Sequence, residues 1–547
     1  MSTALNDFDI HQIVSRFKVD VQEEASVILH YIWRDNPTKS STLSACSSAL
    51  TDDKELYQAL KVAHAHGRYD IVRKWQNSSY FTTPLLYIPI SLSNNSSGIS
   101  LSLPLSEDTT LRTEIHRFLA ELQPTIRRLV VGDIVLPTWS PSTVHDQDPE
   151  IIAHLNSLRI PSLKGKPNLL LHDLGSFTCD VLLERRLRNI FMPNNHTFVF
   201  FFWRYFHYQS FLIRFLVNTS GSGKTRLLLE GLCENWGFYF TSLVDSSLLG
   251  SSDVQKSIQE YVPDSSNFRR VLPPSSASGY EAALKANREI ASRIFRQIFL
   301  ARLMIFNLFA ETMSNYIKGK KNQLDGDDFD PHIYKARWLL LQLQPSFVHP
   351  QVWDVFDELS CKLSNASDSF INTTTKTLLS ATRSYLSLVV QQPGGPITPP
   401  QMSTVETAQI PLFCVLDEAQ YAASQHNSSF RSDQNGSYRP ILREIVKAWE
   451  GQSFGQGVFM VVAGTGISKD VVDQAMASAI MKDSRYRWCS DTGAFDLQDV
   501  QAHYLRKYLP QSLLQTEAGV RLLERVWYWL HGRYVLAFHV AWTIIGY

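Results

Sequence analysis

The chain has 547 residues, of which 44% are hydrophobic and 19% are charged. This composition provides enough apolar material for packed cores and excludes a wholly disordered chain. The 52 basic and 52 acidic side chains give no formal net charge, which argues against a globally basic nucleic-acid coat but leaves room for a local basic groove. At roughly 150 residues per domain, the length suggests about three domains.

The cysteines, the N-terminus and the most apolar segment bear on the compartment. The six cysteines form no Cys-x-x-Cys pair, so free thiols in a reducing compartment are expected. The first residues lack a basic segment followed by an apolar one, so we expect no secretory signal and a cytoplasmic or nuclear protein. Arg204 and Arg214 interrupt the apolar run 198–217. Each would cost roughly 2.5–3.5 kcal/mol at the centre of a membrane, so no membrane partner is expected.

Residues 1–160 are predicted to form a mixed α/β domain. Pro84 and Pro89 would confine one of its strands to a sheet edge or a bulge. No group of residues in this domain has the spacing of a catalytic site. The predicted elements are helices over 20–34, 52–75 and 111–122 and strands over 83–92 and 129–136.

The next segment has the strand, helix, strand order of a parallel sheet. Its glycine-rich turn lies between the first strand and the helix, and Gly237 is expected to end the helix. The predicted elements are strands over 211–217 and 238–244 and a helix over 224–234.

A long helical region follows and then the sheet pattern returns. Apolar side chains recur at i, i+4 over 280–317, which predicts a core helix. Its arginines, Arg288, Arg293, Arg296 and Arg302, are expected to be solvated. Beyond a Pro/Gly-rich linker, the predicted elements are strands over 410–416 and 458–463, a helix over 440–450 and a helical tail over 497–547.

The strongest motif is the glycine-rich run NTSGSGKT between a strand and a helix. In such a loop the backbone N–H groups point at phosphate oxygens, and the helix N-terminus adds a positive partial charge. Lys224 would contact the β- and γ-phosphates, and the Thr225 hydroxyl would ligate Mg²⁺. The candidate nucleotide-binding residues are Asn218, Thr219, Ser220, Gly221, Ser222, Gly223, Lys224, Thr225 and Arg226.

Asn218 departs from the usual phosphate-loop pattern, which has glycine at this position. Because asparagine tolerates left-handed backbone angles better than most residues, we expect the loop to form nevertheless. The alternative interpretation is a chance Ser/Gly turn before a helix.

The second motif, FCVLDEAQ, is an apolar strand that ends in two acidic residues. Asp417 would hold Mg²⁺, and Glu418 would orient or deprotonate the attacking water. Any buried strand can end in acids, so this motif depends on its pairing with the glycine-rich loop. The long separation between Lys224 and Asp417 indicates that the helical region between them is an insertion packed on the sheet.

Two weaker signals complete the candidate catalytic set. Thr465 follows the apolar strand over 458–463 and could contact the γ-phosphate or the attacking water. A simple Gly-rich turn explains the pattern equally well. Arg533 could reach the γ-phosphate from a helical lid, with a surface arginine as the alternative. Arg485 and Arg487 are candidates for an arginine finger in a neighbouring subunit.

These motifs, in this order, resemble those of P-loop ATPases of the AAA+/STAND type. The runs SGSGKTRLLLEGLCENWGFYF, VLDEAQ and VVAGTGIS look like those of a large group of proteins from mushroom-forming basidiomycete fungi. Proteins of this kind are sometimes linked to Crinkler-type effectors. The resemblance covers roughly residues 160–533 and implies ATP as the ligand, Mg²⁺ as the metal and ATP hydrolysis as the activity.

With this resemblance, the expected fold class is α/β. A P-loop NTPase core, which is a parallel sheet flanked by helices, would carry a long helical insertion. The apolar segment 199–215 and the tail 534–547 do not fit the pattern, and we hypothesise that they are unspliced or mispredicted sequence. The expected domains are an N-terminal domain over 1–160, the first part of the core over 161–254, the insertion over 255–390, a linker over 391–409, the second part of the core over 410–470 and a helical lid, possibly truncated, over 471–547.

Three functions stay open at this point. The first is an ATPase that acts as a conformational switch in signalling, defence or effector biology, with turnover raised by a protein partner or by homo-oligomerisation. The second is an interaction scaffold that binds a nucleotide without hydrolysing it. The third is a nucleic-acid-dependent ATPase linked to a nuclease, which the zero net charge disfavours.

Overall fold

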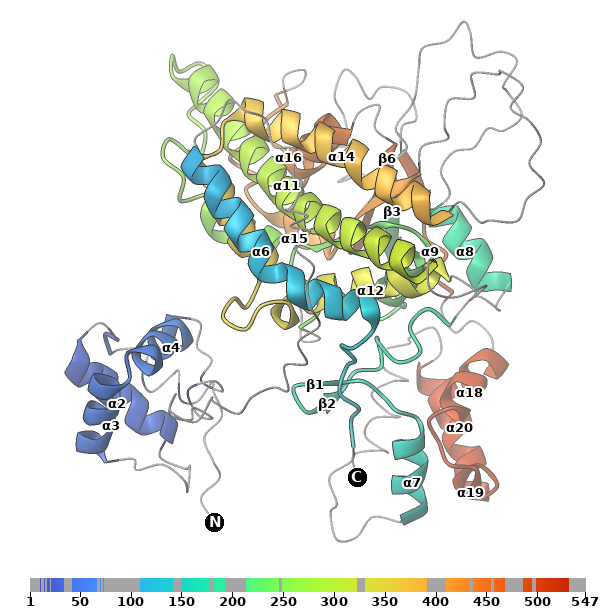
Figure 1. Ribbon diagram of the computed structural model, residues 1–547. Coiled ribbons are helices and arrows are strands. Elements are labelled where there is room, and N and C mark those ends of the chain that lie inside the picture. The colour runs from blue at the N-terminus through green and yellow to red at the C-terminus, as the bar shows by residue number, and fades with distance from the viewer. Residues whose placement is uncertain are drawn as a thin grey trace, which may run out of the picture. The chain divides into compact units, whose positions relative to one another are not determined.

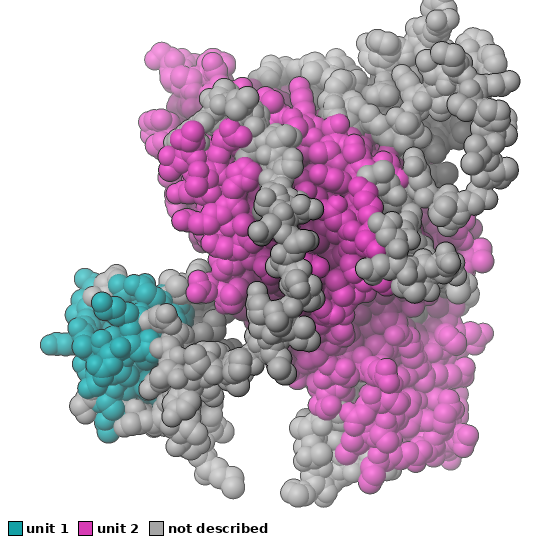
Figure 2. Space-filling model, viewed as in Figure 1, with its two compact units in different colours: residues 1–98 teal, residues 99–547 magenta. Residues whose placement is uncertain are grey.

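The computed structural model divides into two compact units, residues 1–98 and 99–547 (Figure 2). The structure describes residues 10, 14, 17–19, 21–33, 42–65, 69 and 72 of the first unit, and residues 109–140, 149–176, 181–191, 213–244, 248–321, 330–390, 410–432, 436–453, 457–467, 486–493 and 498–530 of the second. The predicted strand over 83–92, the linker over 391–409, most of the segment 199–215 and the tail 534–547 lie outside these residues.

The first unit has a helical core. Helices α2 (Gln22–Trp33), α3 (Leu43–Asp52) and α4 (Lys54–Ala65) bury apolar side chains against one another, among them Leu29 and Leu60. Its described residues contain no strand, so the strand expected for a mixed α/β domain is not seen in this part of the chain.

Helix α6 (Thr109–Val131) belongs to the second unit, so the unit boundary lies well before residue 160. Its buried face, with Ile115 and Leu122, joins the core that contains the long helix α11 (Tyr280–Lys321). The predicted strand over 129–136 is wrong, because α6 runs through Val131 and ends at Gly132. Gly132 adopts a φ of +99°, and a left-handed glycine is a common helix terminator.

The centre of the second unit is a parallel sheet of five strands in the order β4-β5-β6-β3-β7. Buried side chains occupy both faces of the central strands, which explains why their sequences are continuous apolar runs. This confirms the expected α/β class at the level of a parallel sheet flanked by helices. The strands are β3 (Ile213–Asn218), β4 (Gly237–Thr241), β5 (Leu412–Asp417), β6 (Val458–Thr465) and β7 (Tyr486–Cys489), and a separate antiparallel pair comprises β1 (Ser162–Leu163) and β2 (Lys166–Pro167).

Helices cover both faces of the sheet, because successive side chains of a strand point to opposite sides. On β5, Cys414 and Leu416 pack with α11, whereas Phe413 and Val415 pack on the opposite face with α9 (Lys224–Glu234). Helices α6, α11 and α14 (Asp368–Val390) run side by side in Figure 1. The other layer helices are α16 (Ile441–Ser453) beside α11, and α8 (Val181–Phe191) and α12 (Pro331–Leu343) beside α9.

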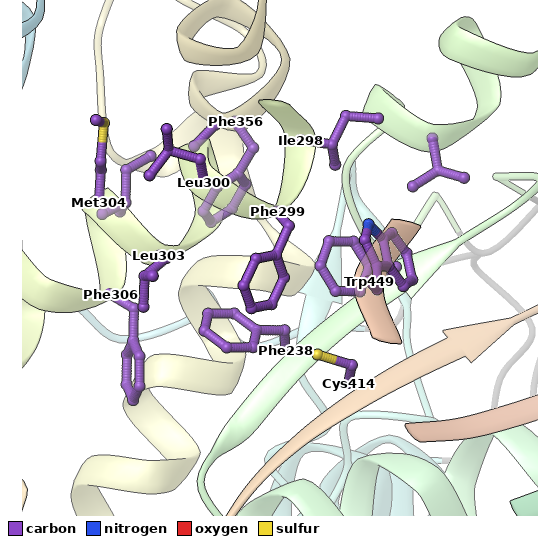
Figure 3. Packing of buried hydrophobic residues seen from close by; sticks show 14 of the residues in the cluster. Phe238, Ile298, Phe299, Leu300, Leu303, Met304, Phe306, Phe356, Cys414 and Trp449 are labelled. Atoms are coloured by element: carbon purple, nitrogen blue, oxygen red, sulfur yellow. The ribbon is translucent and has the colours of Figure 1, made fainter. Parts of the chain in front are cut away.

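The helical region after β4 therefore packs directly on the sheet through an aromatic core (Figure 3). The ring of Phe238 on β4 meets that of Phe299 on α11 edge to face, with centroids 5.6 Å apart. The ring of Phe240 packs against that of Trp449 on α16, with centroids 4.2 Å apart. The shorter elements are α7 (Pro149–Ser157), α10 (Asp253–Lys256), η3 (Ser257–Tyr261), η4 (Pro345–Phe347), α13 (Val355–Lys362), η5 (Leu363–Asn365), α15 (Ala419–Ser424), α18 (Gln498–Arg506), α19 (Gln511–Leu514) and α20 (Glu517–Leu530).

Arg302 of α11 corrects the expectation that the arginines of this helix are solvated. Its side chain is fully buried and donates two hydrogen bonds, of 2.8 and 2.9 Å, to the Asp253 carboxylate. A third bond, of 3.0 Å, reaches the carbonyl oxygen of Tyr239 on β4. A buried guanidinium requires such partners, because an uncompensated charge is costly away from water.

Among the described residues, no helix is both long and apolar enough to cross a membrane.

Candidate functional site

Three of the predicted site residues, Asn218, Asp417 and Thr465, lie at the carboxyl ends of strands along one edge of the sheet. Asn218 is paired in register with Thr465, and Asp417 ends the neighbouring strand β5. In a parallel sheet all carboxyl ends point the same way, and ligands bind at that edge. The order of the strands brings together residues that lie far apart in the sequence.

The glycine-rich loop connects β3 directly to α9. Gly221 and Gly223 adopt φ values of +75° and +85°, which residues with a Cβ atom rarely reach. Ser222 between them is buried, and its hydroxyl has no hydrogen-bond partner among the described residues. Thr219 and Ser220 are exposed. The loop thus presents its backbone at the N-terminus of an eleven-residue helix, where anions bind favourably.

Lys224 holds the loop from the first turn of α9. Its Nζ donates hydrogen bonds to the carbonyl oxygens of Asn218 and Thr219, at 3.1 and 2.7 Å. Burial lowers the pKa of this ammonium, and the nearby charges of Asp417 and Glu418 oppose that decrease. Both predicted acidic residues therefore lie within electrostatic reach of Lys224.

The Thr225 hydroxyl donates a hydrogen bond of 2.8 Å to Oδ2 of Asp417, across 192 positions of the sequence. The same oxygen accepts a bond of 3.1 Å from the Tyr239 hydroxyl, and Oδ1 accepts one from the backbone N–H of Glu418. Burial raises the pKa of Asp417, although these donors and Lys224 oppose the increase. A hydroxyl beside a carboxylate is the hard oxygen donor set that Mg²⁺ prefers.

Glu418 lies at the start of α15 with a left-handed backbone, at φ 53° and ψ 32°. A residue with a Cβ atom adopts these angles at some cost, so such positions often coincide with functional sites. Its carboxylate accepts a hydrogen bond from the side-chain amide of Gln420. The other end of that amide accepts a bond of 3.0 Å from the backbone N–H of Thr465. The two candidate catalytic residues Glu418 and Thr465 are therefore linked through Gln420.

The structure corrects the role expected for Asn218. This residue belongs to β3 and does not have a positive φ, so its tolerance of left-handed angles is not used. Instead its side-chain amide donates bonds of 2.8 Å to the Ser490 carbonyl and the Thr492 hydroxyl, and its Oδ1 accepts one from the Thr219 backbone. Asn218 thus ties the start of the loop to the segment after β7.

The Arg226 side chain is held by the segment before α8. Its guanidinium donates to backbone carbonyls in the turn 169–173 and forms an ion pair of 2.7 Å with Glu230. The same turn contacts the segment between α18 and α19, since Nδ1 of His172 lies 3.1 Å from the Tyr508 hydroxyl. Arg226 therefore joins the start of α9 to this turn, and its expected nucleotide contact stays a prediction.

Of the remaining arginine candidates, only Arg487 is among the described residues. Arg533 and Arg485 lie outside the described residues. Arg487 lies within the edge strand β7, paired with Arg214 of β3. Arg487 precedes the carboxyl end of its strand.

Sequence reasoning missed two residues that contact the acidic pair. Tyr239 reaches Asp417 because β4 pairs with β5, and the sequence carries no signal for that pairing. Gln420 falls within the quoted FCVLDEAQ motif, and its position on the first turn of a helix after Glu418 could have suggested a side-chain contact.

Comparisons with protein-family models, with curated proteins and with solved structures found no match for this chain.

Proposed function

We propose that this chain is a P-loop NTPase of the AAA+/STAND type that binds Mg²⁺-ATP and hydrolyses it. The observation that supports this most is the 2.8 Å contact between the Thr225 hydroxyl and the Asp417 carboxylate, beside a glycine-rich loop and a helix N-terminus. A chance Ser/Gly turn does not require a buried carboxylate from a distant strand at that position.

Each residue has a distinct role in the proposed site. The loop backbone and Lys224 would bind the phosphates, and the ammonium would exchange its two carbonyl contacts for phosphate oxygens. Thr225 and Asp417 would hold Mg²⁺, which supplies positive charge to the phosphates when bound. Glu418 would accept a proton from the attacking water, and Thr465 at the neighbouring strand end would contact the γ-phosphate or that water.

The insertion gives a route from this site to the rest of the unit. Arg302 on α11 donates to the carbonyl of Tyr239, and the Tyr239 hydroxyl donates to Asp417. Replacement of the Tyr239 contact by a metal ion at Asp417 would alter the packing between β4 and α11. We therefore propose a conformational switch, with a protein partner or a second copy of the chain as the element that responds.

Mg²⁺-ATP turnover by the purified chain, compared with turnover by Glu418→Gln, tests this function. We expect slow turnover by the wild type and a loss of about 100-fold or more in the variant, because a positioned general base contributes about 10²–10⁴-fold. ATP affinity should be similar in both proteins. Lys224→Ala should lose binding as well as turnover.

Other outcomes would point to other functions. ATP binding without turnover in either protein would identify a nucleotide-binding interaction scaffold. Turnover that rises on addition of DNA or RNA would favour a nucleic-acid-dependent ATPase. Failure of the wild type to bind ATP would contradict the proposal outright.

A further inference from the structure

Gln420 bridges Glu418 and the end of β6 with both ends of its side-chain amide. It donates to Oε2 of Glu418 and accepts a bond of 3.0 Å from the backbone N–H of Thr465. The Gln420 side chain is half-buried on the first turn of α15. It therefore connects strands β5 and β6 at the edge where the candidate site lies.

The chemistry of the partners fixes the orientation of this amide. A backbone N–H can only donate a hydrogen bond, so the oxygen of Gln420 must face Thr465. The NH₂ group is then directed to the Glu418 carboxylate, which when ionised can only accept. Reversing the amide would place two donors together at one end and two acceptors together at the other.

Gly464 provides the space for this bridge. A Cβ atom at that position would lie 2.9 Å from Oε1 of Gln420 and 2.4 Å from Cδ1 of Ile467. The glycine in the run VVAGTGIS thus lets the amide approach the strand closely.

We propose that Gln420 is a positioning residue that aligns the Glu418 carboxylate for its reaction with water, with the β6 backbone as the fixed support. This role rests on the proposed ATPase function. Glu418 follows directly after the candidate metal ligand Asp417, and the hydrogen bond from Gln420 restricts the positions that its carboxylate can take. The bridge also places the carboxylate in a fixed relation to Thr465.

The test is steady-state ATP turnover by the full chain with Gln420→Leu, which removes both hydrogen bonds at similar volume. We expect kcat to fall by up to about 100-fold, as for small misplacements of a reacting group. KM and ATP affinity should stay within about twofold, because Lys224, Thr225 and Asp417 are unchanged. Gln425→Leu is the matched control, since its amide donates to the Ser424 hydroxyl at the other end of α15, and it should turn over ATP like the wild type.

Two further variants separate positioning from structural support. Gln420→Glu keeps an oxygen acceptor for Thr465 but loses the donor to Glu418, so it should also lose kcat, and it provides the test if Gln420→Leu does not fold. In a Glu418→Gln background, Gln420→Leu should cause little further loss, because Gln420 acts through the carboxylate already removed.

The outcomes are distinguishable. If the wild type turns over ATP and kcat is unchanged in Gln420→Leu or Gln420→Glu, the positioning role is overturned and the proposed ATPase function is retained. The positioning role is also overturned if Gln420→Leu lowers kcat by the same factor in the Glu418→Gln background as in the wild type. Absence of wild-type turnover would overturn the proposed ATPase function and this role together.

Discussion

Asn218 illustrates how a residue that departs from a sequence pattern can be accommodated by tertiary contacts. Its side chain bridges the Ser490 carbonyl, the Thr492 hydroxyl and the Thr219 backbone. Glycine at this position would fit the phosphate-loop pattern better but would lose all three bonds. The structure therefore predicts that the departure stabilises this protein.

We expect Asn218→Gly to lower the free energy of unfolding by about 2–5 kcal/mol, because each of the three lost hydrogen bonds contributes about 0.5–1.5 kcal/mol and glycine adds backbone freedom. Urea denaturation measures this difference. Ser220→Gly, at an exposed position of the same loop, is the control for backbone freedom alone. Equal losses in the two variants would contradict the bridging role.

A second residue-scale prediction concerns the buried carboxyl of Asp357. Burial raises its pKa to about 6 from an ordinary 3.8, although the hydrogen-bonded ammonium of Lys256 opposes the increase. Between these values the folded chain binds more protons at this site than the unfolded chain. This contribution to stability is present below about pH 3.8 and is lost as the pH rises to about 6.

Asp357→Asn should remove this pH dependence. Between pH 3.8 and 6 the wild type should lose up to about 3 kcal/mol more unfolding free energy than the variant, at 1.36 kcal/mol per pKa unit. Urea denaturation of both proteins at several pH values gives the two slopes. Parallel pH dependences would show that Asp357 does not titrate in this range.

At the scale of elements, a fully buried ion pair joins α11 to α10, in addition to the aromatic packing of α11 on the sheet. Arg302 and Asp253 are both buried, and the guanidinium also lies 4.1 Å from the ring centroid of Phe356. The third bond of Arg302, to the Tyr239 carbonyl, joins the helix to the strand beside the candidate site. Gln342 of α12 accepts a bond of 2.8 Å from the Tyr239 backbone N–H, so two helices of the insertion bond to this strand.

Arg302→Met should destabilise the protein by about 3–5 kcal/mol, because it leaves the Asp253 carboxylate buried without its partner. Adding Asp253→Asn should recover part of that loss, so the two changes should not be additive in a double-mutant cycle. Arg296→Met is the control, since its ion pair with Asp368 is partly exposed and should contribute about 1 kcal/mol or less. Additive losses would contradict a direct buried interaction.

At the scale of the whole molecule, the two compact units have separate hydrophobic cores. The candidate site lies wholly within the second unit. That unit also contains the C-terminal helices. Lys507 and Tyr508, in the turn between α18 and α19, contact Asp173 and His172 in the turn that accepts the Arg226 bonds. Ligand binding at the loop should therefore act on the second unit as a whole.

Calorimetric unfolding of the full chain should show separate transitions for the two units. With Mg²⁺-ATP at 100 times its Kd, we expect the transition of the second unit to move to higher temperature, because binding adds about 2.7 kcal/mol to its stability. The transition of the first unit should not move. Lys224→Ala should abolish the shift, and an equal shift of both transitions would indicate that the units unfold together.

The sequence by itself determined the local elements of the sheet core and the residue types of the site. The predicted helix over 224–234 coincides with α9, and predicted strands overlap β3 to β6, because apolar runs bounded by glycine and polar residues specify buried strands locally. The strand prediction failed over 129–131, where α6 continues to a left-handed Gly132. The prediction that Arg302 is solvated also failed, because its burial depends on a distant aspartate.

The tertiary structure decided the contacts that the two motifs did not predict. The order β4-β5-β6-β3-β7 places Tyr239 on Asp417 and sets Thr465 beside Asn218, and no sequence separation encodes that order. The tertiary fold also brings Gln420 into contact with Glu418 and Thr465, and Arg226 into contact with the turn 169–173. Local propensity depends on neighbours along the chain, whereas strand order and side-chain partners depend on how distant apolar faces pack together.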